Sequence, residues 1–146
     1  MNKQHIECRE LDLDIDYPVM KKWWKEHWDT FPPQEIVSPN GVMVEIDGKQ
    51  IITFGLLIVE GTSFALVGNL ISDPNANKRE LYISFKLGME WFKEYSKKKN
   101  ITVMYTLGNQ KGLNKRYQEF GFRVAEQNMT SFIYNNEDID VGWLTD

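Results

Sequence analysis

A hairpin signal near the centre of the chain does most to limit its fold. Asp47-Gly48 lies between two β-rich runs, and Glu60-Gly61-Thr62 lies between the second run and a third. An Asp-Gly pair in this setting is typical of a two-residue hairpin turn, because both turn residues must adopt positive φ. The pattern predicts a three-stranded antiparallel meander, with strands in residues 42–46, 50–59 and 63–72.

The segments on either side of the meander predict further elements. Residues 5–13 alternate loosely between apolar and polar types and indicate a first strand. Asp16, as N-cap, with Pro18 just inside, predicts a helix that runs to about His27. After the meander, Asn77 and Glu80 form the pattern of a capping box. The long helix that begins there carries an apolar stripe at helical spacing: Leu81, Phe85, Met89, Phe92 and Tyr95.

The last part of the chain predicts a strand, a helix and a hairpin. The strand covers 101–106, and the intervening long helix means that it runs parallel to its neighbour or crosses over. A helix over 109–120 then ends at Gly121, which is suited to a C-cap. A final hairpin is expected from residues 122–125 and 129–134. We expect one domain over 1–134 and an acidic tail over 135–146, which is disordered or docks through Ile139, Val141, Trp143 and Leu144.

Composition excludes several classes of protein. The 146 residues carry a formal net charge of −4, so no overall positive field favours nucleic acid. Cys8 is the single cysteine, which rules out an internal disulfide, and we expect no metal site. Charged residues near the start leave no signal-peptide core, and no apolar run reaches membrane-spanning length. We therefore expect a cytoplasmic protein without a membrane partner.

The segment 109–122 carries a motif with Asn109 at its start, Tyr117 near its end, and Gly121-Phe122 closing it. This motif resembles the late half of the GNAT superfamily of acyl-CoA-dependent N-acyltransferases. The order of the predicted elements is similar to that superfamily over residues 5–134. Trp23-Trp24 in the first helix is similar to small phage-type members. The resemblance implies an α/β (α+β) fold whose mixed, mostly antiparallel sheet has six to seven strands. The resemblance further implies that helices lie on both faces and that the sheet splays between its fourth and fifth strands.

The resemblance also implies a site for acetyl-CoA as co-substrate in the gap between the splayed strands. The earlier strand would pair with pantetheine, and the start of the long helix would hold the pyrophosphate. Residues 73–79 depart from the family pattern because they contain no glycine. Lys78 and Arg79 fit phosphate contacts and solvated surface positions equally well. The cofactor-binding positions implied are Leu70, Ile71, Ser72, Asn77, Lys78, Arg79 and Asn109.

The chemistry implied by the family needs a base, an acid and donors that polarise the thioester carbonyl. Tyr117 matches the family's proton donor, although a tyrosine there also suits packing. Asn109 is also a good N-cap. The base candidates are Glu60, Asp73 and His27, and each residue type is common in solvated loops. Trp23 and Trp24 suit either the core or a lid, or an acceptor pocket.

Two functions follow from this reading. The first is an N-acetyltransferase that acts on an amine of a small molecule, a protein or a modified nucleobase. The second is a catalytically inactive binding or structural module, which the glycine-free segment 73–79 favours. The enzyme is the preferred interpretation. Neither the acceptor nor the oligomeric state is readable from the sequence, so a homodimer and a nucleic-acid partner stay open.

Overall fold

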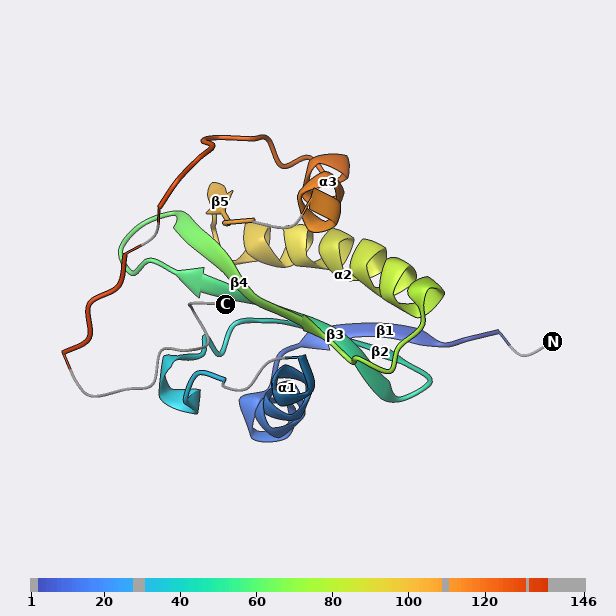
Figure 1. Ribbon diagram of the computed structural model, residues 1–146. Helices are drawn as coiled ribbons and strands as arrows, with labels where there is room; N and C mark the ends of the chain where they lie inside the picture. Colours follow the sequence, from blue (N-terminus) through green and yellow to red (C-terminus); the bar gives the residue numbers. More distant parts are fainter. Residues whose placement is uncertain (1–2, 28–30, 109–110, 131, 137–146) are drawn as a thin grey trace.

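The computed structural model describes residues 3–27, 31–108, 111–130 and 132–136 (Figure 1). One five-stranded sheet has the order β1-β2-β3-β4-β5. In chain order the elements are β1 (Ile6–Glu10), α1 (Leu13–His27), the 3-10 helix η1 (Gln34–Ile36), β2 (Gly41–Ile46), β3 (Lys49–Ile58), β4 (Phe64–Ser72), α2 (Lys78–Lys98), β5 (Val103–Tyr105) and α3 (Lys111–Glu119).

The predicted meander is confirmed. β2 pairs antiparallel with β3, and β3 pairs antiparallel with β4. β1 also pairs antiparallel with β2. At the β2–β3 turn, Asp47 has φ 50° and Gly48 has φ 80°. Both turn residues therefore adopt the left-handed conformation that their sequence predicted.

α2 crosses one face of the sheet and brings β5 in parallel to β4. Its capping box is formed as predicted, because the Asn77 and Glu80 side chains each accept a hydrogen bond from the other's backbone N–H. The stripe on α2 packs on the alternate side chains of the meander that face it. The buried members of this cluster include Val42, Val44, Phe54, Leu56, Phe85, Met89, Phe92 and Tyr95.

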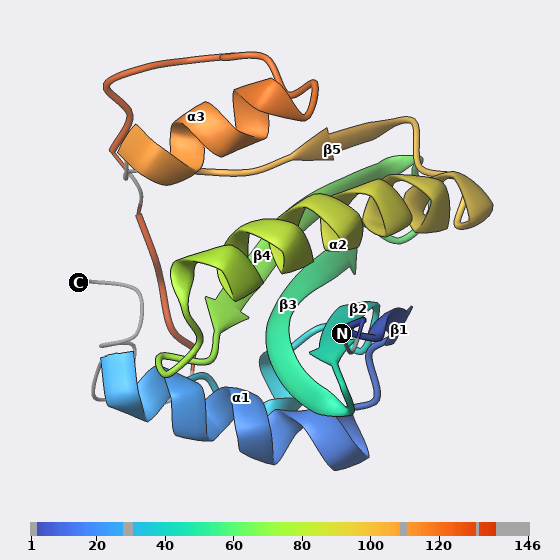
Figure 2. The same ribbon diagram turned by 90° about the vertical axis from the view of Figure 1, so that its right-hand side faces the viewer.

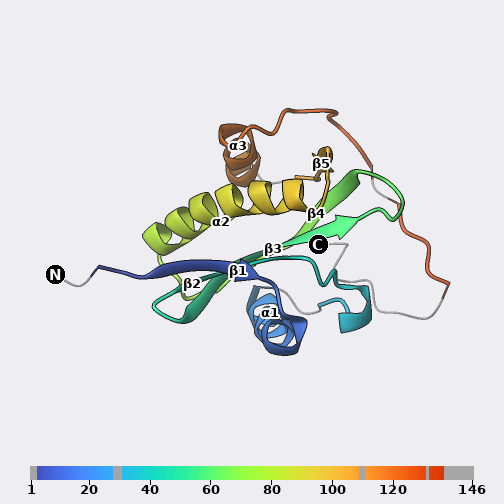
Figure 3. The same ribbon diagram turned by 180° about the vertical axis from the view of Figure 1, so that it is seen from behind.

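α1 packs on the opposite face. Met20 and Trp23 lie in a second buried cluster with Met43 and Ile71. Successive residues of a strand point to opposite faces of the sheet. Met43 of β2 therefore packs in the cluster under α1, whereas the next residue, Val44, packs in the cluster under α2. Figures 1 and 3 show α1 and α2 on opposite sides of the sheet.

The predicted start of α1 is wrong. The helix begins at Leu13, and Asp12 acts as its N-cap, because Asp12 Oδ1 accepts a hydrogen bond from Asp14 N at 3.0 Å. Asp16 lies inside the helix and is fully buried, and its carboxylate accepts two hydrogen bonds from the Arg9 guanidinium. Pro18 is consequently within the helix and not at its first turn.

The end of α3 follows the prediction. Gly121 has φ 95°, Phe122 N donates to Tyr117 O, and Gly121 N donates to Gln118 O. This pair of bonds is a Schellman motif. The accompanying apolar contact is also present, because the Tyr117 and Phe122 ring centroids lie 5.2 Å apart.

The expected sheet of six to seven strands is wrong for the described part of the chain, where the sheet has five. The hairpin predicted from 122–125 and 129–134 is not formed, since no strand occurs in the described residues after α3. Phe132 is 92% exposed and Tyr134 is 84% exposed. The alternation of apolar and polar residues over 122–134 predicted which side chains would share a face of a strand. It could not show whether the rest of the protein offers a surface on which that face is buried. β5, with three residues, offers only a short edge for pairing.

Candidate active site

The sheet opens between β4 and β5. The two strands pair only from Phe64–Val103 to Leu66–Tyr105. Just beyond, Thr106 Oγ1 donates to Val67 O at 3.1 Å. From Gly68 to Ser72, no described strand pairs with β4 on this side. Figure 2 shows β4 and the segment that follows β5 diverging from this point.

A β-bulge lies in β4 where the opening begins. Thr53 pairs with Ile71, but Gly55 pairs with Gly68, so Asn69 and Leu70 together oppose a single residue of β3. Asn69 has φ 52°, the left-handed conformation that asparagine tolerates. A bulge leaves backbone groups out of the ladder, and such groups are available to a ligand.

The loop after β4 is held firmly. Asp73 is buried, its Oδ1 accepts from Asn75 N at 2.9 Å, and its Oδ2 lies 3.3 Å from Lys49 Nζ. These contacts give Asp73 a structural role at the turn. The loop delivers the N-terminus of α2 directly after the free part of β4, with Lys78 and Arg79 exposed in its first turn.

Tyr117, on α3, lies in the buried core cluster that also contains Phe85 and Val67. Its side chain is 6% exposed and packs on Phe85 and Phe122 at ring-centroid distances of 6.2 and 5.2 Å. Burial raises the pKa of the Tyr117 hydroxyl, and a hydrogen bond with the Thr106 side chain partly opposes that rise. The hydroxyl therefore keeps its proton at neutral pH. Through Thr106, Tyr117 is connected to Val67 at the point where the strands separate.

The other candidate residues lie in different places. His27 ends α1, and its Nε2 lies 3.1 Å from Ser72 O at the end of β4. Glu60 is exposed in the β3–β4 turn, at the opposite end of β4, so the structure does not bring it to the opening. Asn109 lies outside the described residues.

The two tryptophans differ in their surroundings. Trp23 is buried in the core cluster under α1. Trp24 is only partly buried and lies 5.1 Å from Phe31 between ring centroids, and Phe31 also contacts Tyr17 at 5.6 Å. Trp23 therefore holds α1 on the sheet, and Trp24 belongs to an aromatic group at its flank.

Sequence reasoning missed the bulge and Thr106. Gly68-Asn69 inside an apolar run was the available signal, because glycine within a strand often marks a bulge and asparagine tolerates positive φ. Nothing in the sequence singled out Thr106. Among the described residues, no three His, Cys, Asp or Glu side chains gather as a metal site. No described helix has the length and hydropathy needed to span a bilayer.

No protein-family model matches the sequence, and a comparison with curated proteins finds no match. Solved structures do match. The aminoglycoside N-acetyltransferase AAC(6')-Iy, solved with CoA, superposes with a TM-score of 0.62 over 92% of this chain and 97% of its own, at 14% identity. The chain has the GNAT fold.

Two further structures share this GNAT fold. N-acetylglutamate synthase from Neisseria gonorrhoeae, complexed with coenzyme A and N-acetyl-glutamate, gives a TM-score of 0.65 over 86% of this chain and 30% of its own, at 14% identity. Glucosamine-6-phosphate N-acetyltransferase from Arabidopsis thaliana gives 0.60 over 89% and 99%, at 10% identity.

Proposed function

We propose that this chain is an N-acetyltransferase that takes its acetyl group from acetyl-CoA and passes it to an amine. The observation that carries the proposal is the opening between β4 and β5, with a bulge at its closed end and the α2 N-terminus at its open end. Structures with this fold were solved with CoA, namely AAC(6')-Iy and the N-acetylglutamate synthase. The arrangement of this chain's own residues suits the same donor.

The donor-binding residues proposed are those along the free part of β4 and the first turn of α2. On the side toward β5, the backbone of β4 from Leu70 to Ser72 has no strand partner among the described residues. That side suits an extended pantetheine, as a sheet edge suits a peptide. The backbone N–H groups of Lys78 and Arg79 have no partner within the helix, because the first residues of a helix never do. They lie at the positive end of its dipole and suit phosphate, with their side-chain charges nearby.

Asn77 and Glu80 limit that fit. Their capping box occupies the N–H groups of both residues, and it places a carboxylate at the helix start. Phosphate binding at this end would therefore depend on Lys78 and Arg79 more than on Asn77. Asn109 stays a sequence-based proposal for the cofactor wall.

The proposed chemistry uses Tyr117, the backbone at Asn69, and His27. Acetyl-CoA supplies a thioester, whose carbonyl an amine attacks. Tyr117, protonated at neutral pH, would give its proton to the departing thiolate. Backbone N–H groups freed by the bulge at Asn69 would polarise the carbonyl oxygen. His27, or water ordered beside it, would remove the proton of the attacking amine.

The acceptor is proposed only as an amine. The solved neighbours name an aminoglycoside, N-acetyl-glutamate and glucosamine-6-phosphate, which are small molecules. The aromatic group around Trp24 is the part of α1 that suits an acceptor, whereas Trp23 is committed to the core.

A calorimetric titration with acetyl-CoA tests the first step. We expect saturable binding, and no measurable heat at millimolar acetyl-CoA would refute the enzyme. Tyr117→Phe should then keep donor binding while lowering kcat by about 10²–10⁴. Tyr105→Phe, on β5, is the matched control and should retain the wild-type rate. Equal rates for the two variants would remove Tyr117 from the proton-donor role.

One observation favours a binding module without catalysis. The segment 73–79 has no glycine, and its capping box already satisfies part of the helix terminus. If acetyl-CoA does not bind, the inactive module becomes the better description of this fold.

A further inference from the structure

An apolar surface lies on the sheet at the end where β4 and β5 are paired. The register places Leu57, Leu66 and Tyr105 side by side in one row. The next row continues the register, because Val59 N donates to Phe64 O and Phe64 pairs with Val103. We refer to these six residues as the apolar strand-end face: Leu57, Val59, Phe64, Leu66, Val103 and Tyr105.

All six side chains point away from α2. Their strand neighbours Leu56, Ala65 and Met104 belong to the α2 cluster, and side chains alternate between faces along a strand. The apolar strand-end face is thus on the same side of the sheet as α1. The cluster under α1, however, meets β4 at Ile71, near the other end of that strand.

No helix of the described structure covers this face. Leu57 is 50% exposed and Val103 is 51% exposed, and Val59 and Phe64 are exposed as well. Single exposed apolar residues are common on proteins. Four of them brought together by strand register form a contiguous patch, which is uncommon unless another segment binds there.

The chain itself contains a segment that fits this face. Ile139, Val141 and Trp143 are apolar and alternate with Asp140 and Gly142. In extended chain, residues two apart lie about 6.6 Å from one another on one side. The two rows of the face are also two residues apart along each strand, so the spacing matches when the segment runs along the strand direction.

The chain is already led to the edge of the face before this segment. Tyr105 Oη donates to Met129 Sδ at 3.7 Å, which brings the segment after α3 beside β5. The chain from Met129 to Ile139 spans about 33 Å when extended, which is ample to turn and cross the face.

We propose that residues 139–143 pack on the apolar strand-end face, with Ile139, Val141 and Trp143 turned toward Leu57, Phe64 and Val103. The segment then serves as the cover that this face lacks. The inference does not depend on acetyltransferase activity.

Disulfide trapping tests the proposal in the full chain. Cys8→Ser removes the native thiol, and Val141→Cys is combined in turn with Leu57→Cys, Val59→Cys or Val103→Cys. A disulfide needs Cα atoms about 4.4–6.8 Å apart, so it reports true proximity. Ile15→Cys, on α1 and 57% exposed, is the matched control partner. We expect an intramolecular disulfide from at least one face position and none from Ile15→Cys.

Two outcomes overturn the proposal. Disulfides that join two chains assign the face to a second copy of the protein. The absence of any disulfide above the Ile15→Cys control shows that the segment does not lie there.

Trp143 gives an independent measurement that needs no cysteine. The fluorescence of Trp143 is obtained as the difference between the spectra of the wild type and Trp143→Phe. Quenching of that fluorescence by iodide reports how exposed the Trp143 side chain is. Leu57→Glu should increase the quenching of Trp143 by placing a charge under it, whereas Ile15→Glu should not. Circular dichroism confirms that both variants fold. Equal quenching in wild type and Leu57→Glu contradicts the packing.

Discussion

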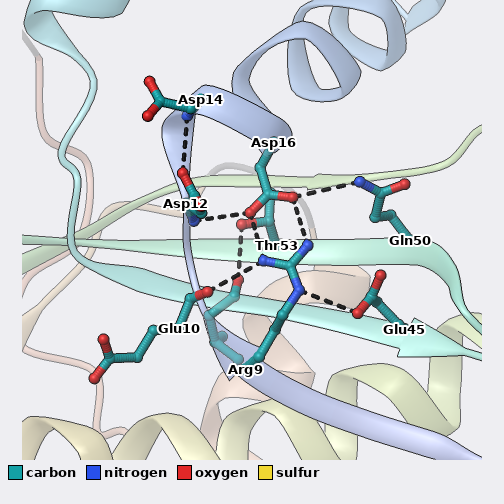
Figure 4. Close-up of polar contacts among 9 residues, drawn as sticks. Arg9, Glu10, Asp12, Asp14, Asp16, Glu45, Gln50 and Thr53 are labelled. Atoms are coloured by element: carbon teal, nitrogen blue, oxygen red, sulfur yellow. Dashed lines mark hydrogen bonds and ion pairs between the residues drawn. The ribbon is translucent and has the colours of Figure 1, made fainter.

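Arg9 and Asp16 form a two-point ion pair, with Nη1 to Oδ2 at 2.8 Å and Nη2 to Oδ1 at 2.7 Å (Figure 4). Asp16 is fully buried, and Gln50 and the Asp12 backbone also donate to it. Arg9 Nε reaches Glu45 Oε1 at 3.0 Å. The pair therefore ties α1 to β1 and β2, and it fixes the helix whose last residue, His27, lies beside Ser72.

Removal of Arg9 should destabilise the protein strongly. Arg9→Met leaves the Asp16 carboxylate buried without its partner, and the free energy of unfolding should fall by about 3–5 kcal/mol. Arg9→Met with Asp16→Asn should recover part of this loss, because the amide carries no buried charge. Lys97→Met removes an exposed pair with Glu94 and should cost about 1 kcal/mol or less. Urea unfolding measures all three, and equal losses for Arg9→Met and Lys97→Met would contradict the assignment.

The same pair predicts how stability depends on acid. Burial raises the pKa of Asp16, but its hydrogen bonds and charge interaction with Arg9 outweigh burial and hold the pKa below the ordinary 3.8. A carboxylate with a lowered folded-state pKa stabilises the fold above its unfolded pKa. That stability is lost as the pH falls through 3.8 toward the folded value. Asp16→Asn should therefore flatten the fall in unfolding free energy between pH 5 and pH 3, and an unchanged slope would refute this contribution.

Gly88 permits the close approach of α2 to the sheet. A Cβ at this position would lie 2.8 Å from Phe54 Cε2 and 2.8 Å from Val44 Cγ2. Helix propensity favours alanine over glycine by about 1 kcal/mol, whereas overpacking of a core costs about 1–3 kcal/mol. Packing should decide the sign, so Gly88→Ala should lower the Tm. Gly112→Ala, in α3 with open space around it, is the control and should not lower it.

The elements that could be predicted are those set by local chemistry. Asp47-Gly48, the Asn77–Glu80 box and Gly121 each need only neighbours in sequence, and the structure forms all three. Asp16 was misassigned because its role depends on Arg9, a strand residue that sequence spacing does not connect to a cap. The prediction of the final hairpin was wrong for a related reason: its strands would need the exposed edge of another strand to pair with, and the local sequence does not show whether one is available.

The site divides in the same way. Tyr117 was named from a resemblance, and the structure buries it in the core beside Thr106, whose hydroxyl contacts β4 at Val67. Glu60 follows a strand in the sequence, as a base might, but the hairpin carries it to the far end of β4. The bulge at Asn69 was missed although Gly68-Asn69 carried a signal for it, because the apolar residues on both sides of that pair indicate a regular strand.

Glu80 should weaken the binding of the proposed donor. Its Oε1 accepts from Asn77 N at 3.0 Å, so its negative charge lies at the α2 N-terminus where phosphate would bind. Glu80→Gln keeps an oxygen for that hydrogen bond but removes the charge. Charges at a helix end contribute about 0.3–1 kcal/mol, so the affinity for acetyl-CoA should rise about two- to fivefold. Glu94→Gln, near the other end of α2 and exposed, is the matched control and should leave the Kd unchanged. Calorimetry at low ionic strength measures the Kd of both variants. A higher Kd for Glu80→Gln would show that the carboxylate supports donor binding through the cap and does not compete with the phosphates.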